Sequence, residues 1–196
     1  SPACAGARAE VTSAVGRSVT FQLPTRDGEA AAWSFHDDVI VTVKFGDPPE
    51  AIFLDERYKP RWAFPERGRA LTISRLAAGD AGTYTAKTAG VKTTFTLRLY
   101  QELPAPTVSC VAQNCSADGC RYTLRCAASG SGSGNVSYLW SVGDWRRSEG
   151  PTVLVEETPW DEKPLTCTAQ NPVSSRNVTV VSPAALCAGN GRGTRV

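Results

Sequence analysis

The stretch Asp80-Ala81-Gly82-Thr83-Tyr84-Thr85-Ala86 decides how the first half of the 196-residue chain folds. After Gly82 the side chains alternate, with two threonines on one face and Tyr84 and Ala86 on the other, as expected of a strand with one buried face. A tyrosine that begins such a strand directly after a turn is typical of a tyrosine corner. The stretch therefore predicts a strand at a corner of an antiparallel β-sandwich.

Alternating segments flank this stretch in the first half of the chain. Three of them are expected as strands: 18–23, 70–76 and 94–100. In the first of these, Val19, Phe21 and Leu23 share the core side, and Trp33 follows ten residues after Leu23, where a central strand should cross the sheet. The longer stretch 39–54 leaves room for two extra strands. The first half therefore has the strand set of a complete variable-type sandwich.

The spacing of cysteine and tryptophan identifies the kind of sandwich. In the second half, Cys126, Trp140 and Cys167 are spaced as the inter-sheet disulfide of an immunoglobulin domain and the tryptophan that packs on it. The first half keeps the same frame without the bridge, because its matching residues are Leu23, Trp33 and Ala86. Two tandem immunoglobulin-like sandwiches, with only the second braced by a core disulfide, are therefore expected.

The second half shows the same alternation with shorter spacing. Its expected strands are 121–127, 136–142, 152–156, 165–170 and 177–181. This spacing leaves little room for extra strands, and the glycine- and serine-rich residues 129–134 are expected as a natural loop. A bridge between Cys126 and Cys167 would close a loop of about 40 residues, which the chain-entropy view values at about 4 kcal/mol.

The other cysteines leave alternatives open. Cys120 and Cys187 lie at strand ends that neighbour each other in this topology, so a second bridge between them is sterically sensible. Cys110 and Cys115 would then be left to close a local turn. Cys4 is the odd one out, and we expect it to be a free or an intermolecular thiol.

Two charged residues of the first half, Arg61 and Asp80, are also informative. Their spacing matches the salt bridge that often closes the bottom of variable-type domains. The alternative is that they are two unrelated surface charges.

The composition indicates an extracellular protein. Six of the seven cysteines lie between Cys110 and Cys187, and three glycosylation sequons lie in the same half, at Asn114, Asn135 and Asn177. The formal net charge of +2 provides no basic field for nucleic acid. The chain has no methionine and no apolar run long enough to span a bilayer, so we expect an ectodomain whose signal peptide and anchor are missing.

Catalytic and metal-binding chemistry is not indicated. His36 is the only histidine and has no nucleophile motif near it, so we expect no enzyme. The cysteines lack the Cys-x-x-Cys spacing of zinc sites, and the glycine-rich residues 129–134 precede a strand and not a helix, so no metal, phosphate ligand or other cofactor is expected. The function should therefore reside in a surface.

Alternation selects one face of the first sandwich as that surface, on the sheet of strands G, F, C and C′. Its expected partner-binding residues are Ser34, His36, Ile40, Thr42, Lys44, Phe53, Thr85, Lys87, Lys92, Thr94 and Thr96. The alternative is an ordinary solvated face, since exposed hydroxyls and lysines are common. His36 is either a hydrogen-bonding group at the rim, which would add pH sensitivity, or an exposed turn residue before Asp37 and Asp38.

Two longer motifs carry a family resemblance. The segment Cys167-Thr168-Ala169-Gln170-Asn171-Pro172-Val173-Ser174 and the paired-cysteine segment Gly119-Cys120-Arg121-Tyr122-Thr123-Leu124-Arg125-Cys126 resemble strands F and B in the SLAM (signaling lymphocytic activation molecule) family of lymphocyte receptors. The resemblance covers nearly the whole chain and is greatest to the subgroup of the Ly-nine and NTB-A receptors. Leu165, at the usual corner-tyrosine position, and the extra cysteines depart from the pattern.

The resemblance implies an all-β chain with a variable-type domain without a core disulfide, followed by a constant-2-type domain with two disulfides. The implied extents are a recognition domain at 1–101, a proline-stiffened linker at 102–106, a spacer domain at 107–189 and a stalk remnant at 190–196. The implied location is the outer face of the plasma membrane, with a secreted form as the alternative.

The resemblance also implies a partner. In this family the G, F, C and C′ sheet mediates head-to-head docking between cells, often with an identical receptor, so we expect homophilic adhesion and co-signalling between leukocytes. One alternative is a heterophilic ligand or virally captured secreted decoy that binds another SLAM-family receptor. Another is a matrix protein that uses the two sandwiches only as spacers, with no partner in solution.

Overall fold

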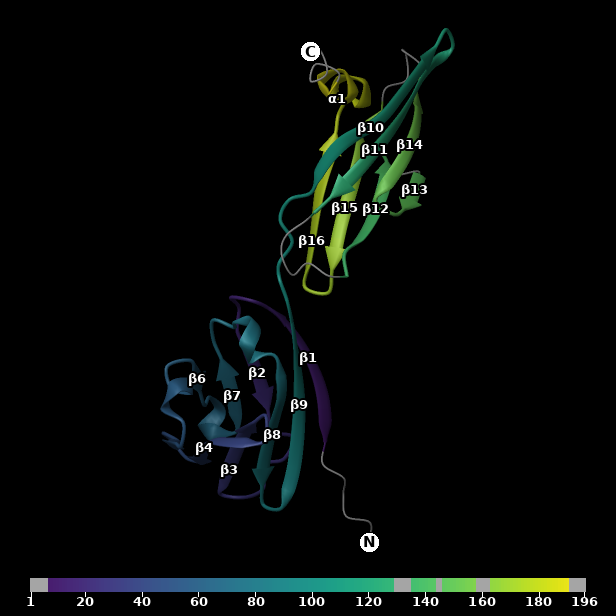
Figure 1. The fold of residues 1–196 in the computed structure, drawn as a ribbon. Coiled ribbons are helices and arrows are strands. Elements are labelled where there is room, and N and C mark those ends of the chain that lie inside the picture. Colours follow the sequence, from purple (N-terminus) through teal and green to yellow (C-terminus); the bar gives the residue numbers. More distant parts are fainter. Residues whose placement is uncertain (1–6, 129–134, 144–145, 158–162, 191–196) are drawn as a thin grey trace. The chain divides into compact units, whose positions relative to one another are not determined.

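The computed structural model describes residues 7–128, 135–143, 146–157 and 163–190 of the chain. Its contacts divide the chain into two compact units, Ser1–Tyr100 and Gln101–Val196 (Figure 1). Both units are built almost wholly from β-strands, in agreement with the all-β prediction. Cys4 and the loop 129–134, which the sequence singled out, lie outside the described residues.

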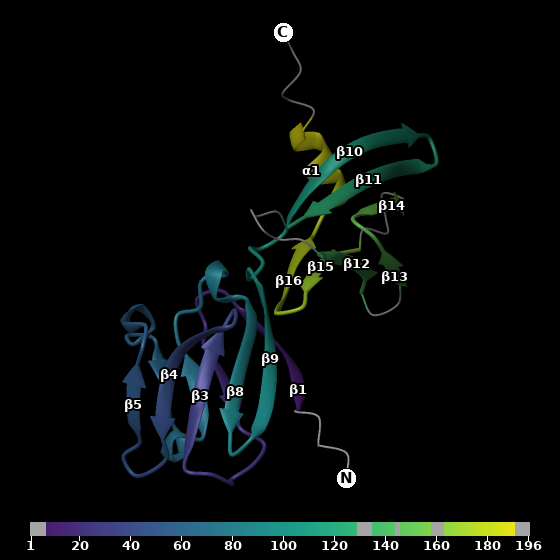
Figure 2. The same ribbon diagram turned by 60° about the horizontal axis from the view of Figure 1, so that its bottom comes forward.

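Two sheets form the first unit. One has six strands in the order β1-β9-β8-β3-β4-β5, seen side by side in Figure 2, and the other has the order β2-β7-β6. The strands are β1 (Arg8–Ala14), β2 (Val19–Gln22), β3 (Ala30–Phe35), β4 (Asp38–Lys44), β5 (Glu50–Phe53), β6 (Trp62–Ala63), β7 (Ala70–Ile73), β8 (Gly82–Thr88) and β9 (Val91–Tyr100). Three short 3-10 turns join them: η1 (Glu56–Tyr58), η2 (Glu66–Gly68) and η3 (Ala78–Asp80).

An aromatic cluster fills the space between these sheets. The ring centroids of Phe21 and Phe95 lie 4.8 Å apart, and Trp33 lies 6.3 Å from Phe21 and 5.8 Å from Phe95. At the two positions where a core cystine would sit, Leu23 packs against the cluster and Ala86 is fully buried opposite Trp33. Each aromatic pair adds about 0.5–1.5 kcal/mol beyond its burial. Three pairs are therefore comparable with the roughly 2–5 kcal/mol of a native disulfide.

The tyrosine corner and the salt bridge expected from the sequence share one residue, Asp80. The Tyr84 hydroxyl donates to the Asp80 carbonyl oxygen, as a tyrosine corner requires. The Asp80 carboxylate accepts two hydrogen bonds from Arg61, at 2.6 and 2.7 Å, and one from the Ala77 N–H at 2.7 Å. The predicted Arg61–Asp80 bridge is therefore confirmed.

These contacts set the protonation states at the corner. Burial raises the pKa of Asp80, but the hydrogen bonds from Arg61 and from the Ala77 N–H lower it by more, so the pKa lies below the ordinary value of 3.8. Burial raises the pKa of Tyr84 well above its ordinary value of 10.0. The carboxylate is thus charged and the phenol remains a hydrogen-bond donor at physiological pH.

Two sheets also form the second unit, in the orders β10-β11-β14 and β13-β12-β15-β16. The elements are β10 (Thr107–Ser116), β11 (Gly119–Ala127), β12 (Ser137–Val142), β13 (Arg146–Glu149), β14 (Thr152–Glu157), β15 (Leu165–Asn171), β16 (Ser174–Val180) and the helix α1 (Pro183–Asn190). The helix was not predicted from the sequence.

A disulfide between Cys126 on β11 and Cys167 on β15 joins these two sheets. Trp140 is buried directly opposite Cys167 in the β12–β15 register, and its Nε1 donates to the Pro151 carbonyl oxygen at 3.1 Å. Leu165, at the position of a corner tyrosine, is fully buried. The second unit thus has the cysteine and tryptophan frame that the first unit lacks.

The structure corrects the other two disulfide pairings that were expected from the residues. The bridge expected between Cys120 and Cys187 is absent, because Cys187 pairs with Cys110 and Cys120 pairs with Cys115. The β10–β11 hairpin extends to its tip with Cys115 directly opposite Cys120, and α1 folds back on β10. The second unit therefore holds three disulfides where the family resemblance implied two.

The segment expected as a linker is attached to the second unit. Leu103 is only 2% exposed and packs with Ala128 and Ala169. Its N–H donates to the Ser174 hydroxyl at 2.9 Å, and the Asn171 side chain donates to the Gln101 carbonyl oxygen at 2.6 Å. The start of this segment thus belongs to the core of the second unit.

The aromatic cluster leads to a stability prediction. Phe21→Ala removes a side chain that contacts Trp33, Tyr84 and Phe95, so it should destabilise the first unit by about 3–5 kcal/mol. Hydrogen exchange of first-unit peptides, followed by mass spectrometry over a urea titration, measures this loss separately from the second unit. The exposed variant Ser18→Ala is the control, and equal midpoints for the two variants would contradict a packing role for the cluster.

The buried ion pair leads to a pH prediction. Because the pKa of Asp80 is lowered in the folded state, its stabilising effect is complete above the ordinary aspartate range and is lost as pH falls below 3.8 toward the native pKa. Asp80→Asn should destabilise the first unit at neutral pH and make its stability less sensitive to acid, as measured by urea titrations at successive pH values.

The control for that experiment is Asp55→Asn, which breaks the ion pair with Arg57, whose side chain is largely exposed. Exposed pairs contribute little, so this variant should change the pH profile much less. Identical profiles of stability against pH for the two variants would contradict the prediction, because the buried Arg61–Asp80 pair would then contribute no more than the exposed pair.

Candidate functional site

The described residues do not assemble a metal centre. Within 7–128, 135–143, 146–157 and 163–190, no group of three or more His, Cys, Asp or Glu side chains is placed to hold a metal ion. In the same part of the chain, no helix has the length and apolar character needed to cross a membrane. The candidate site expected from the sequence is a surface of the first unit, and the register of the six-stranded sheet determines its members.

The face of this sheet that points away from the core is called the outer face here. Neighbours in register point to the same side, so the outer residues form rows across the strands. The first row is Thr94, Thr85, Ser34 and Val39, and the second is Lys92, Lys87, Ala32, Thr42 and Ile52. Thr96 and Thr83 lie beyond the first row, and Lys44 and Glu50 lie beyond the second.

A β-bulge changes the expected membership of this face. The β3–β4 register shifts between Trp33 and Ser34, so Ile40 and Val41 are both buried and Val39 is 44% exposed. The expectation that Ile40 points outward is therefore wrong, because Ile40 is 2% exposed and belongs to the core. The unbroken apolar run Val39-Ile40-Val41 was the sequence signal for this irregularity.

Phe53 also points toward the core and not outward. It pairs with Val41, is half-buried, and its ring centroid lies 6.0 Å from that of Phe64. The residues on either side of it are the exposed ones, with Ile52 at 69% and Leu54 at 64%. Sequence reasoning missed these two residues and Ala32, although alternation from Trp33 would have placed Ala32 outward.

His36 lies at a turn and not within the rows. His36 and Asp37 are the central residues of the β3–β4 hairpin, with φ values of 49° and 68°, as in a type I′ turn. The imidazole ring centroid lies 4.0 Å from that of Phe35, and a Cβ on Gly82 would come within 2.4 Å of the imidazole Cε1. Gly82, with φ of 141°, thus makes room for the ring, and the structure favours the turn-residue interpretation of His36.

The outer face has two chemically different halves. Three exposed aliphatic residues, Val39 on β4, Ile52 on β5 and Leu54 directly after β5, form what we call the apolar half. Exposed Lys87 and Lys92 lie over β8 and β9, and we call this the basic half. Small side chains such as those of Ala32, Ser34 and Thr85 separate the halves, so the face suits a flat protein partner.

The glycosylation sequons all lie in the second unit on exposed asparagines. Asn114 is on β10, Asn135 lies two residues before the start of β12, and Asn177 is on β16. Cys115, in the middle of the first sequon, is bonded to Cys120. Any glycans on these sites would be remote in sequence from the outer face.

Comparison with curated proteins finds related surface antigens, although no family model matches the chain. Human SLAM family member 7 is 27% identical over 95% of this chain. Human T-lymphocyte surface antigen Ly-9 is 32% identical over 73% of it, and human SLAM family member 5 is 31% identical over 99% of it. The chain spans 59%, 24% and 59% of these relatives, respectively.

Comparison with solved structures supports the fold alone. The CD2-binding domain of CD58 (lymphocyte function-associated antigen 3) aligns with a TM-score of 0.61 and 18% identity, covering 89% of this chain and 96% of that one. Murine CEACAM1b aligns with a TM-score of 0.62 and 16% identity, covering 87% and 94%. Both are immunoglobulin-like, so the all-β architecture of this chain is an immunoglobulin-like fold.

Proposed function

The chain belongs to the SLAM family of the immunoglobulin superfamily, and from this premise we propose that it is the extracellular part of an immune-cell receptor that binds an identical receptor on an apposed cell. As a member of this family it is a receptor-type protein and not an enzyme. Three disulfides in the second unit support an oxidising, extracellular location. Attachment to the plasma membrane is part of the same proposal.

Within this proposal, the first unit is a variable-type domain and the second is of the constant-2 type. In the first unit, β4 and β5 both extend the sheet beyond β3, as strands C′ and C″ do in variable domains. In the second unit, only β13 extends the sheet beyond β12 among the described residues. Residues 1–101 would then be the recognition domain and 107–189 the spacer.

The observation that carries the homophilic proposal is the exposed apolar half of the outer face. The apolar surface of Val39, Ile52 and Leu54 is exposed to water in the single chain. Contact with another molecule would remove it from water, which is favourable. In a two-fold dimer the same patch meets itself, so apolar halves in contact would form the centre of the interface. That arrangement also keeps Lys87 and Lys92 of one copy away from the same lysines of its partner.

The face that we propose as the docking surface is a revised set of residues. It keeps eight residues expected from the sequence: Ser34, Thr42, Lys44, Thr85, Lys87, Lys92, Thr94 and Thr96. It adds Ala32, Val39, Ile52 and Leu54. It omits three expected residues: the buried Ile40, the inward-facing Phe53 and the turn residue His36. Hydroxyl groups around an apolar centre suit a modest, reversible contact between cells.

The basic half supports the alternative function. Lys87 and Lys92 are cross-strand neighbours with like charge, an arrangement that an acidic partner surface would stabilise. A heterophilic ligand, or a virally captured secreted decoy, that binds another SLAM-family receptor would use this half as the centre of the interface. The two functions therefore depend on different ends of the same face.

Sedimentation equilibrium of the wild-type chain and two arginine variants tests the homophilic proposal. Ile52→Arg puts a charge into the apolar half and should weaken self-association by about tenfold or more, the effect of losing a central apolar contact. Leu154→Arg is the matched control, because Leu154 on β14 is also exposed, at 61%, but lies in the second unit. It should leave self-association unchanged.

A wild-type chain that stays monomeric at high micromolar concentration would contradict the homophilic proposal. Equal weakening by both variants would also contradict it, because it would indicate non-specific association. Lys87→Glu then separates the alternatives, since it should abolish binding to an acidic receptor and have a smaller effect on an interface centred on Ile52.

A further inference from the structure

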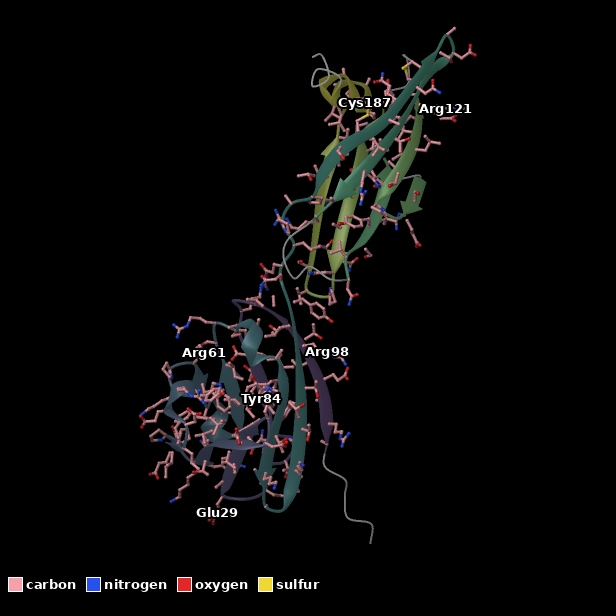
Figure 3. The ribbon with its side chains drawn as sticks, in the orientation of Figure 1. Glu29, Arg61, Tyr84, Arg98, Arg121 and Cys187 are labelled. Atoms are coloured by element: carbon pink, nitrogen blue, oxygen red, sulfur yellow. A yellow bond between two sulfur atoms is a disulfide. The ribbon has the colours of Figure 1, made fainter. Side chains whose placement is uncertain are left out.

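A hollow of about 810 Å³ lies at one end of the first unit. It forms where β2 and β4 end and the η2 turn begins, at the end of the unit where Figure 3 labels Glu29. Leu23 and Phe45 supply its apolar surface, and Arg26, Arg67 and Arg69 line it together with Glu66. Its volume is in the range of sites that bind small ligands.

The residues that line this hollow carry a net positive charge. Three arginines elsewhere in the first unit form ion pairs: Arg57 with Asp55, Arg61 with Asp80 and Arg98 with Glu10. In contrast, no carboxylate in the described part of the chain pairs with any of the three lining arginines. The side chain of Glu66 accepts a hydrogen bond from the Gln22 amide at 3.2 Å. Three arginines and one glutamate leave two net positive charges in the lining.

Contacts inside the unit hold one of these arginines in place. Arg69 donates from Nη1 to the Arg26 carbonyl oxygen at 2.6 Å, and its guanidinium carbon lies 4.4 Å from the Phe45 ring centroid. Both contacts leave other guanidinium N–H groups available, since arginine has five donors. A guanidinium fixed in this way loses less entropy when it binds an anion.

The backbone beside the hollow is strained. Glu66 and Arg67 have φ values of 56° and 59°, and Gly68 follows at 90°. Two successive non-glycine residues in the left-handed region cost free energy, and such strain clusters at sites that bind ligands. A Cβ on Gly68 would approach Pro49 and Val43 at 3.0 Å, so the turn is held tightly against β4 while it presents Arg67.

We propose that this hollow binds the sulfate or carboxylate group of an acidic glycan. Planar guanidinium groups bind such oxyanions through paired, charge-assisted hydrogen bonds. The apolar surface of Leu23 and Phe45 suits the C–H face of a sugar ring, and glycans are the usual carriers of these anions outside cells. The inference rests on the extracellular location in the proposed function, but not on self-association.

Calorimetric titration of the full chain with two probes tests the site: a heparin-derived oligosaccharide, which carries sulfates, and sialyllactose, which carries a carboxylate. Arg26→Ala and Arg67→Ala should each lower the affinity about tenfold, the effect of losing one charge-assisted contact. Both side chains are exposed and should not be needed for folding, which circular dichroism checks. Arg98→Ala removes the same charge outside the hollow and should leave affinity nearly unchanged.

The outcomes separate the sources of the anion and the two proposals. Binding of the heparin oligosaccharide alone assigns the site to sulfate, and binding of sialyllactose alone assigns it to carboxylate. The inference is wrong if neither probe binds at millimolar concentration, or if Arg98→Ala weakens binding as much as the lining variants do. Ile52→Arg should lose self-association and keep glycan affinity, so failure of one proposal is distinguishable from failure of the other.

Discussion

The first unit depends on the packing of Phe21, Trp33 and Phe95 between its two sheets. In most immunoglobulin domains a disulfide joins the sheets at this level, and here Leu23 and Ala86 replace the cysteines. The ring cluster keeps the sheets in contact by dispersion and apolar burial. Unlike a disulfide, these interactions do not bond one sheet covalently to the other. The Arg61–Asp80–Tyr84 corner adds directional hydrogen bonds at one edge of the same core.

The strand register that packs this core also decides which residues lie on the outer face. Trp33 is buried on the inner side of β3, and Ala32 and Ser34 therefore lie on the outer side. The bulge opposite them moves Ile40 into the core and leaves Val39 outside. A single extra residue in β4 thus decides which aliphatic side chain stabilises the domain and which is available to a partner.

In the second unit, a covalent bond joins the two sheets. The Cys126–Cys167 bridge joins its sheets beside Trp140, the Cys115–Cys120 bridge closes the tip of the β10–β11 hairpin, and the Cys110–Cys187 bridge ties α1 to β10. These bonds lower the conformational entropy of the unfolded chain, so the stability of the unit depends less on packing.

The amino-acid sequence alone indicated the all-β class, most of the central strands and the tyrosine corner, because period-two alternation and short turn motifs act between residues close in the chain. The Arg61–Asp80 pair, 19 residues apart, followed from its spacing in a variable-type frame. No ranges were predicted for β1, β6, β10 and β13. The sequence also determined eight members of the outer face by the same alternation. Only the tertiary structure decided the burial of Ile40, the Cys110–Cys187 pairing and the grouping of Arg26, Arg67 and Arg69. Each of these depends on strand register or on contacts between distant segments, which alternation within one segment does not encode.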